Sequence, residues 1–391
     1  MLRMSMTTPL KMLGAVALAG LVATALVPAA GAEDGTVKIG VIAPFTGAAA
    51  AYGATAWQGS VLAAEQINKE GGLNGRQIEL FQGDDACVPA TGVTVAQRMI
   101  NLDKVQIILG AVCSSVTLAL MPLAEQNEVL LVNATSSNPK ITYQAGVGGN
   151  IWTFRNLGSD ETRARVTLEY AIKEKGRKKF GVLAVDNDFG RDAIKYVKKY
   201  AAEHPQVELL TEDYYVLAET DFRPVLNKIK ARGADGIIFF GVVGTTPILC
   251  AQMHELDMGK DASPLIGSVN VSPQMLEQCP ESSLEGTVEA VSWLDSLDSA
   301  ENQKFVEDYR ARFNGETPDA AAYDNWSTLF IIRDAMKMAN STENRDVIKA
   351  LQEGSFPSPL GDISFDDHHQ SDIPMILLEV KGKERVVKGL F

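Results

Sequence analysis

The chain has 391 residues, a formal net charge of −13 at pH 7 and 46% hydrophobic residues. An acidic balance of this size argues against a nucleic-acid or anionic-lipid partner, because both attract basic surfaces. The length is sufficient for two domains of ordinary size.

Residues 1–32 have the composition of an export signal. Arg3 and Lys11 lie at the start, an uncharged apolar run ends before Pro28, and small residues continue to Ala32. A charged start, a short apolar core and an A-x-A site are typical of a secretory signal peptide, so we expect cleavage after Ala32. No cysteine that could carry a lipid lies near this site, and every later apolar run is too short to span a membrane. We therefore expect a mature protein that is free in the periplasm.

From residue 37, short β-branched segments alternate with longer amphipathic ones. This alternation predicts strands followed by helices, an order that produces a parallel sheet covered by helices on both faces. The predicted strands are 37–45, 76–85, 106–112 and 129–135, and the predicted helices are 52–70, 89–102 and 114–127.

The same alternation restarts near residue 161 and predicts a second α/β unit. Its strands are 178–188, 207–216, 234–242 and 263–270, with helices at 161–175 and 249–256 and others ending at residues 203 and 232. The tail then predicts helices at 301–313, 319–340 and 345–353, and strands at 373–380 and 385–390. We expect the tail to return to both units, so that a first lobe comprises 33–154 with 295–361 and a second comprises 155–294 with 362–391. Three crossings between lobes would form a hinge.

Four cysteines remain after the signal segment, an even number that predicts disulfides in an oxidising compartment. Their order favours Cys87 with Cys113 and Cys250 with Cys279, although the other pairings remain open. No C-x-x-C spacing supports a metal site. His368 and His369 are adjacent and do not share a helical face, so a solvated loop is the simpler interpretation.

Several motifs resemble one family. These are VKIGVIAPFTG at 37–47 with Tyr52-Gly53, INKEGGLNGRQIEL at 67–80, DDAC at 84–87, GAVCSS at 110–115 and DNDFGRD at 186–192. They resemble the periplasmic leucine and branched-chain amino-acid binding proteins over nearly the whole mature chain. The resemblance implies the class I periplasmic-binding fold, in which two doubly wound parallel-sheet lobes close on a ligand, and it supports pairing of Cys87 with Cys113.

The resemblance also implies a function. Family members are monomeric receptors of ABC importers, need no cofactor and deliver a small ligand to an inner-membrane permease and ATPase complex. A ligand-sensing module of the same fold is the alternative, and the lack of a fused membrane or DNA-binding segment in the sequence favours transport. Enzyme motifs fail on context: Asp188-Phe189-Gly190 lacks the accompanying kinase motifs, and no nucleophile or metal constellation is visible. We expect no catalytic activity.

Ligands of open parallel sheets bind beyond the carboxyl ends of the strands. Ser114 and Ser115 follow one predicted strand and begin a helix, where free amides suit a carboxylate. Thr135 and Ser137 follow the next strand. An ordinary helix cap and a polar loop are the alternatives. The resemblance places Ser114, Thr135 and Ser137 against the ligand carboxylate.

The resemblance further places Tyr52 and Phe189 over the ligand and Tyr323 in a wall. It also reveals a departure, since Val269 stands where amino-acid-binding members carry an acid for the ligand ammonium. Asn270 can still bind a carbonyl or hydroxyl. Either another acid, Asp324 or Asp188, takes that role, or the ligand is an aromatic or keto acid without an α-ammonium.

Overall fold

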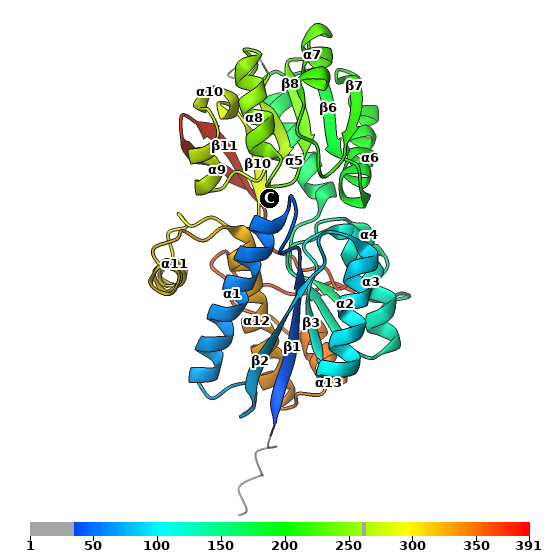
Figure 1. Cartoon of the computed structure of the whole chain (residues 1–391), viewed down its shortest axis with the longest axis vertical. Coiled ribbons are helices and arrows are strands. Elements are labelled where there is room, and N and C mark those ends of the chain that lie inside the picture. The colour runs from blue at the N-terminus through cyan, green and yellow to red at the C-terminus, as the bar shows by residue number, and fades with distance from the viewer. Residues whose placement is uncertain (1–34, 260–262) are drawn as a thin grey trace, which may run out of the picture. The chain divides into compact units, whose positions relative to one another are not determined.

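The computed structural model describes residues 35–259 and 263–391, and the predicted cleavage site lies outside them. These residues form a five-stranded and a seven-stranded sheet, each covered by helices (Figure 1). We call each sheet with its helices a lobe. The arrangement confirms the α/β class with two parallel-sheet lobes.

The first sheet is parallel throughout and consists of the short apolar segments that the sequence predicted as strands. Its central strands are almost fully buried, as expected for a sheet covered on both faces. In sheet order the strands are β2 (Gln77–Asp84), β1 (Thr36–Ala43), β3 (Ile107–Gly110), β4 (Leu130–Asn133) and β5 (Thr153–Arg155).

The second sheet is parallel except at one edge, where the two last strands of the chain pair antiparallel. The antiparallel pairing of β11 with β12 follows from the tight turn between these consecutive strands. In sheet order the strands are β12 (Glu384–Leu390), β11 (Ile376–Lys381), β10 (Val288–Val291), β9 (Leu265–Ser268), β8 (Gly236–Phe240), β6 (Lys179–Val185) and β7 (Glu208–Tyr215).

Helices connect the strands in both lobes. Those between strands of the first sheet are α1 (Ala50–Lys69), α2 (Pro89–Arg98), α3 (Ser114–Gln126) and α4 (Lys140–Tyr143). A π-helical turn, Met99–Asp103, ends α2. Those that precede or connect strands of the second are α5 (Asp160–Lys173), α6 (Asp188–Glu203), α7 (Arg223–Ala231), α8 (Thr246–Glu255), α9 (Pro273–Gln278) and α10 (Glu281–Leu284).

The tail contributes to both lobes. Its helices are α11 (Ala300–Arg312), α12 (Ala320–Ala339) and α13 (Asn344–Glu353), and α12 packs along α1 of the first lobe. Gly59 of α1 makes this packing close, because a Cβ there would lie 2.0 Å from the Ala322 carbonyl oxygen. Strands β11 and β12 complete the second sheet. The residue boundaries of the lobes stay a prediction.

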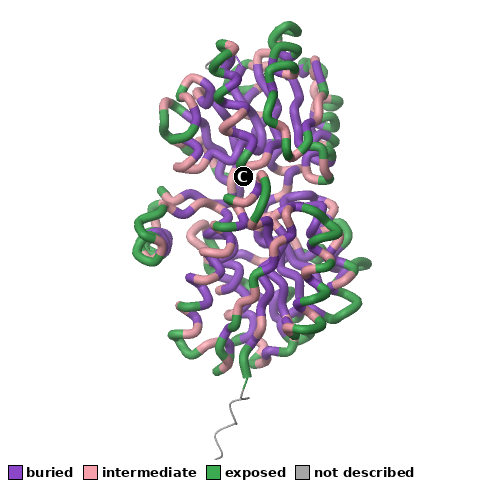
Figure 2. Tube along the Cα trace, in the orientation of Figure 1, coloured by how far each residue is buried: buried purple, intermediate pink, exposed green. Residues whose placement is uncertain are grey.

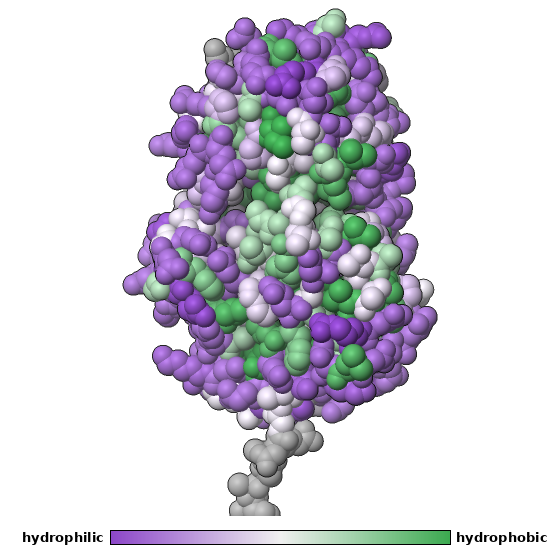
Figure 3. All heavy atoms as spheres, viewed as in Figure 1, coloured by the Kyte–Doolittle hydropathy of each residue, from purple (hydrophilic) through white to green (hydrophobic). Residues whose placement is uncertain are grey.

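The core follows the strands of both sheets, and exposed residues lie on outer helix faces and turns (Figure 2). The face drawn in Figure 3 is hydrophilic at its top and flanks, and apolar residues gather along its middle. In the described part of the chain, no helix combines the length and apolar character needed to cross a bilayer.

Two expectations about side chains need correction. Cys87 and Cys113 form a disulfide, but Cys250 and Cys279 are free thiols buried in the second-lobe core. The Cys250 thiol lies against that of Cys279, and Cys279 Sγ is 3.4 Å from Met275 Sδ, so this pair serves apolar packing. His369 is fully buried rather than solvated: it stacks on Phe154 with ring centroids 3.8 Å apart.

Candidate functional site

A cavity of about 100 Å³ lies where the carboxyl ends of strands from both sheets meet. One water needs roughly 10–15 Å³ of such space, so the cavity has room for a small molecule of several heavy atoms. Six of the eight ligand-binding residues predicted from the sequence line it, namely Tyr52, Ser114, Thr135, Ser137, Phe189 and Asn270.

The N-terminus of α3 forms one part of the first-lobe wall. The amides of Val116 and Thr117 bond to the Cys113 carbonyl, so those of Ser114 and Ser115 have no partner inside the helix. Cys113, at the N-cap of α3, makes no side-chain capping hydrogen bond, and Ser114 lines the cavity. The disulfide between Cys87 and Cys113 fixes the chain just before the helix. Free amides and a hydroxyl at a helix N-terminus are a carboxylate-binding arrangement.

The turn after β4 forms the neighbouring part of this wall. Asn133 Oδ1 accepts hydrogen bonds from the amides of Thr135 and Ser136 at 2.9 and 2.7 Å, which folds the chain back toward the cavity. Asn325 Nδ2 donates to Thr135 Oγ1 at 3.3 Å, so the Thr135 hydroxyl keeps its proton available. Ser137 Oγ, in contrast, donates to Asp160 Oδ2 at 2.9 Å. Thr135 therefore faces the cavity as a donor, whereas Ser137 is already engaged.

Two aromatic residues close the cavity from opposite lobes. The Tyr52 hydroxyl, from α1, donates to Asn270 Oδ1 of the second lobe at 2.7 Å. Phe189, at the start of α6, packs against Phe240 with ring centroids 6.0 Å apart and turns its remaining surface to the cavity. Burial, reinforced by nearby carboxylates, raises the pKa of Tyr52 well above its usual value, so its hydroxyl remains a donor.

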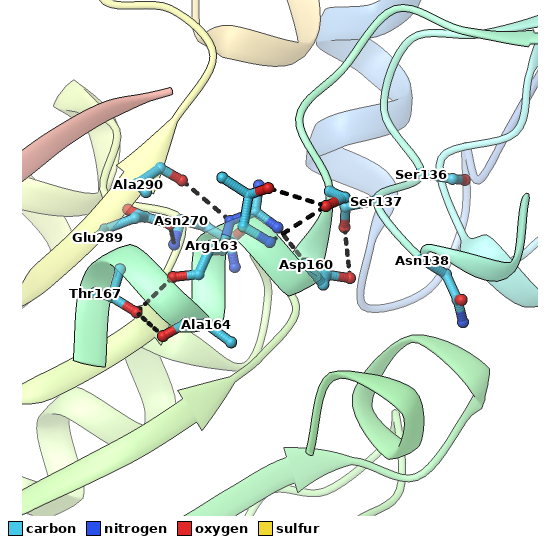
Figure 4. A network of polar contacts seen from close by, with 12 residues as sticks. Ser136, Ser137, Asn138, Asp160, Arg163, Ala164, Thr167, Asn270, Glu289 and Ala290 are labelled. Atoms are coloured by element: carbon cyan, nitrogen blue, oxygen red, sulfur yellow. Dashed lines mark hydrogen bonds and ion pairs between the residues drawn. The ribbon is translucent and has the colours of Figure 1, made fainter. Parts of the chain in front are cut away.

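Arg163 brings a cation into the second-lobe wall. It lies on α5, its side chain is only 10% exposed, and its guanidinium lines the cavity. Figure 4 shows Arg163 between Asp160 and Ala290. Nη1 is ion-paired with Asp160, and Nε donates to the Ala290 carbonyl at 3.0 Å. Burial raises the pKa of Asp160, opposed first by Arg163 and then by Ser137. Sequence reasoning missed both charged residues.

Glu289 supplies an acidic side chain next to the position of Val269. Val269 is buried in the second-lobe core, but the carboxylate of Glu289, on adjacent β10, lines the cavity directly beside it. Glu289 accepts hydrogen bonds from the amides of Val269, Asn270 and Val271 at 3.0, 2.7 and 2.7 Å. These bonds hold Asn270 in a left-handed conformation, with φ of 66°. Burial raises the pKa of Glu289, and the three amides oppose this.

Asp324, not Tyr323, reaches the cavity from α12. Tyr323 stacks on Trp293 in the first-lobe core with centroids 5.1 Å apart, because the helix turns the neighbouring position toward the ligand space. Asp324 accepts the Ser292 hydroxyl, whose Oγ lies 3.0 and 2.8 Å from the two carboxyl oxygens. Burial raises its pKa well above the usual range.

Two further candidate residues lie outside the cavity wall. Ser115 is buried but is not part of the cavity wall, since the helical turn directs it away from Ser114. The Asp188 side chain is also outside the wall, which Asn187 and Phe189 form on either side of it. Of the two acids considered as substitutes at the Val269 position, only Asp324 lines the cavity.

Comparisons with known proteins agree with this architecture. A family model described as periplasmic binding protein matches residues 36–385. The chain belongs to the periplasmic binding protein family. Its family and relatives are solute-binding proteins and not enzymes, which accords with the sequence prediction.

Curated relatives of this periplasmic binding protein cover most of its length. The Leu/Ile/Val-binding protein homolog 1 of Brucella suis biovar 1 (strain 1330) is 28% identical over 357 residues, which cover 91% of this chain and 93% of that protein. The leucine-, isoleucine-, valine-, threonine-, and alanine-binding protein of Pseudomonas aeruginosa is 27% identical over 332 residues, covering 85% and 86%.

Solved structures share the fold. The solute binding protein of an ABC transporter from Rhodopseudomonas palustris BisB5, in complex with 3,4-dihydroxybenzoic acid, has a TM-score of 0.80 and 26% identity, covering 91% of this chain and 96% of that one. A leucine binding protein from Thermotoga maritima MSB8 also has a TM-score of 0.80, at 23% identity, covering 91% and 99%.

Proposed function

We propose that this periplasmic binding protein is the receptor of an ABC importer, capturing a small carboxylate between its lobes for delivery to a permease and ATPase complex. The free amide of Ser114 at the N-terminus of α3, together with the Ser114 and Thr135 hydroxyls, carries the proposal. These donors belong to residues that line one cavity, and a carboxylate is the ligand group that accepts several donors at once.

The relatives support a carboxylate ligand from two sides. The Pseudomonas aeruginosa relative is named for binding amino acids, and the Rhodopseudomonas palustris structure holds a dihydroxybenzoic acid. These ligands share a carboxylate and differ in the rest of the molecule. Export to the periplasm, cleavage after Ala32 and a monomeric state belong to the same proposal.

The test is calorimetric binding of the purified mature protein to aliphatic amino acids, aromatic carboxylates and oxo acids, with Ser114→Ala and Ser115→Ala as a matched pair. Ser114→Ala removes a hydroxyl from the cavity wall and should weaken the best ligand by about 5- to 10-fold, the value of one net hydrogen bond. Ser115→Ala changes the adjacent residue on the same helix and should leave affinity within about twofold, below half a kcal/mol.

Binding of no carboxylate, or equal losses in both variants, would refute the site. Importer and sensor roles separate in cells: deletion of the gene should abolish uptake of the bound carboxylate. Normal uptake combined with a lost transcriptional response would favour the ligand-sensing alternative.

A further inference from the structure

Within the part of the chain that the structure describes, one nitrogen of the Arg163 guanidinium has no hydrogen-bond partner. Nε donates to the Ala290 carbonyl and Nη1 is ion-paired with Asp160, whereas Nη2 forms no hydrogen bond within the described residues. Arg163 lines the cavity and its side chain is nine-tenths buried. Nη2 is not fully buried, and because Arg163 lines the cavity, a ligand oxygen there can accept a hydrogen bond from this nitrogen.

The position of Nη2 is set before any ligand arrives. Asp160 is itself held by the Ser137 hydroxyl at 2.9 Å, and the planar guanidinium is anchored through its two other nitrogens. Figure 4 shows this chain of contacts running from Ser137 through Asp160 to Arg163 and Ala290. Because the fork is rigid, little conformational entropy is lost when Nη2 binds an acceptor.

Two acids that line the cavity accept hydrogen bonds from the protein. Glu289 accepts three backbone amides, and Asp324 accepts the Ser292 hydroxyl. Among the described residues, each wall also has a donor without a protein partner: the Ser114 amide in the first lobe and Arg163 Nη2 in the second. A ligand that accepts hydrogen bonds from the donors on both walls needs oxygen atoms at two separate places in the molecule.

The charges indicate which kind of second oxygen fits. Asp160 balances the positive charge of Arg163 from behind the wall, and Glu289 lines the cavity together with Arg163. A second carboxylate would face these two acids with no cation left to neutralise it. A hydroxyl or oxo oxygen accepts from Nη2 without adding negative charge.

We propose that Arg163 is a specificity-determining residue that selects carboxylates bearing a hydroxyl or oxo oxygen remote from the carboxylate. This rests on the proposed function, since it assumes that the carboxylate binds at α3. Val269, in place of an acid, leaves the ligand class undecided between amino acids and other carboxylates. Selection by Arg163 would favour oxygen-bearing carboxylates.

Two matched ligand pairs test the selection: 4-hydroxybenzoate with 4-methylbenzoate, and 4-oxopentanoate with 4-methylpentanoate. Each pair differs mainly by an oxygen in place of a methyl group. By calorimetry, the wild-type protein should bind the oxygenated member of at least one pair about 10- to 100-fold more tightly, the range for a hydrogen bond to a charged donor. Equal affinities in both pairs would overturn the proposal, and this arm needs no variant.

Arg163→Lys keeps a cation for Asp160 but removes Nη2, and Arg165→Lys makes the same change at an exposed site on the same helix. Arg163→Lys should abolish the preference while the methyl ligand binds within about threefold of the wild-type affinity, and Arg165→Lys should change neither. If Arg163→Lys weakens both members equally, Arg163 serves the carboxylate or the fold and the proposal is wrong. If the wild type binds neither these acids nor any other carboxylate, the proposed function fails as well.

Discussion

The first-lobe wall of the cavity consists mainly of helix amides and hydroxyls, whereas the second-lobe wall contains ionisable side chains held by partners of their own. In the first lobe, Ser114 and Thr135 come directly after strands of a parallel sheet. In the second lobe, Arg163 is tied to Asp160, and Glu289 is tied to three amides. One wall presents donors for a carboxylate, and the other presents a fixed pattern of charge.

This difference assigns separate tasks to the two walls. Amides and hydroxyls recognise a carboxylate whatever is attached to it, so the first lobe can serve every acid of suitable size. An anchored guanidinium next to two carboxylates recognises only a group with matching charge and geometry. Specificity within the carboxylates should therefore reside in the second lobe.

The first prediction concerns the covalent support of the first wall. Replacing Cys87 and Cys113 together by serine should lower the free energy of unfolding by about 3 kcal/mol, because the bridge spans a sequence separation of 26. Urea unfolding measures this loss. Reductant should reproduce it in the wild-type protein and have no effect on the double variant, since Cys250 and Cys279 are free thiols. A further loss on reduction of the variant would mean that the second lobe also carries a bridge.

The second prediction concerns the charge that organises the second wall. Glu289→Gln should cost about 2 kcal/mol of stability, because one face of the new amide would present N–H groups to backbone N–H groups. Glu203→Gln, at an exposed position at the end of α6, is the control and should change stability by less than about 0.5 kcal/mol. Equal urea midpoints for both variants would show that the Glu289 carboxylate does not support the wall.

These two walls also differ in how far the sequence predicts them. The βαβ alternation predicts the first sheet, and residues just after its strands must lie at one edge, so Ser114 and Thr135 could be identified. Arg163 and Glu289 lie inside a helix and a strand, where sequence position does not reveal which side chain turns to the cavity. A lone acid in the apolar segment VEAV was the available signal for Glu289.

Other details that the sequence did not determine have similar causes. Tyr323 and Asp324 are adjacent on α12, and a helix turns about 100° per residue, so a shift of one position exchanges core for cavity. Chain order suggested a disulfide between Cys250 and Cys279. The two thiols are indeed neighbours, but they are not bonded to each other. Antiparallel pairing of β11 with β12 follows from their short connection.

The third prediction concerns the pH dependence of stability that Asp85, close to Cys87 of the disulfide, gives to the first lobe. Burial raises the pKa of Asp85 from 3.8 to about 6, and no described residue forms a hydrogen bond with its Oδ2. The folded state therefore holds this proton more tightly than the unfolded state. Its contribution to stability is fully present below pH 3.8 and is lost as pH rises to about 6.

Asp85→Asn should remove this dependence and raise the free energy of unfolding at pH 7, relative to pH 4, by about 1–2 kcal/mol compared with the wild type. Urea unfolding at both pH values measures the difference. Asp362→Asn, at an exposed loop position, should leave the wild-type pH profile unchanged. An unchanged profile in Asp85→Asn would show that Asp85 is not the titrating group.

The smallest predicted effect concerns the bond that joins the two walls. Tyr52→Phe removes the hydroxyl that donates to Asn270 Oδ1 at 2.7 Å and leaves that oxygen without its donor from the first lobe. This bond exists only when the lobes meet, so its loss should weaken ligand binding by about fivefold, close to 1 kcal/mol, mainly through faster dissociation. Stopped-flow binding measures the association and dissociation rates of the ligand separately.

Tyr143→Phe is the control. It removes a hydroxyl that bonds Glu161 at an exposed site away from the cavity wall, and it should alter neither rate. If Tyr52→Phe instead slows association with no change in dissociation, the hydroxyl guides ligand entry, and the two walls are held together by other contacts such as the ion pair of Lys140 with Asp192.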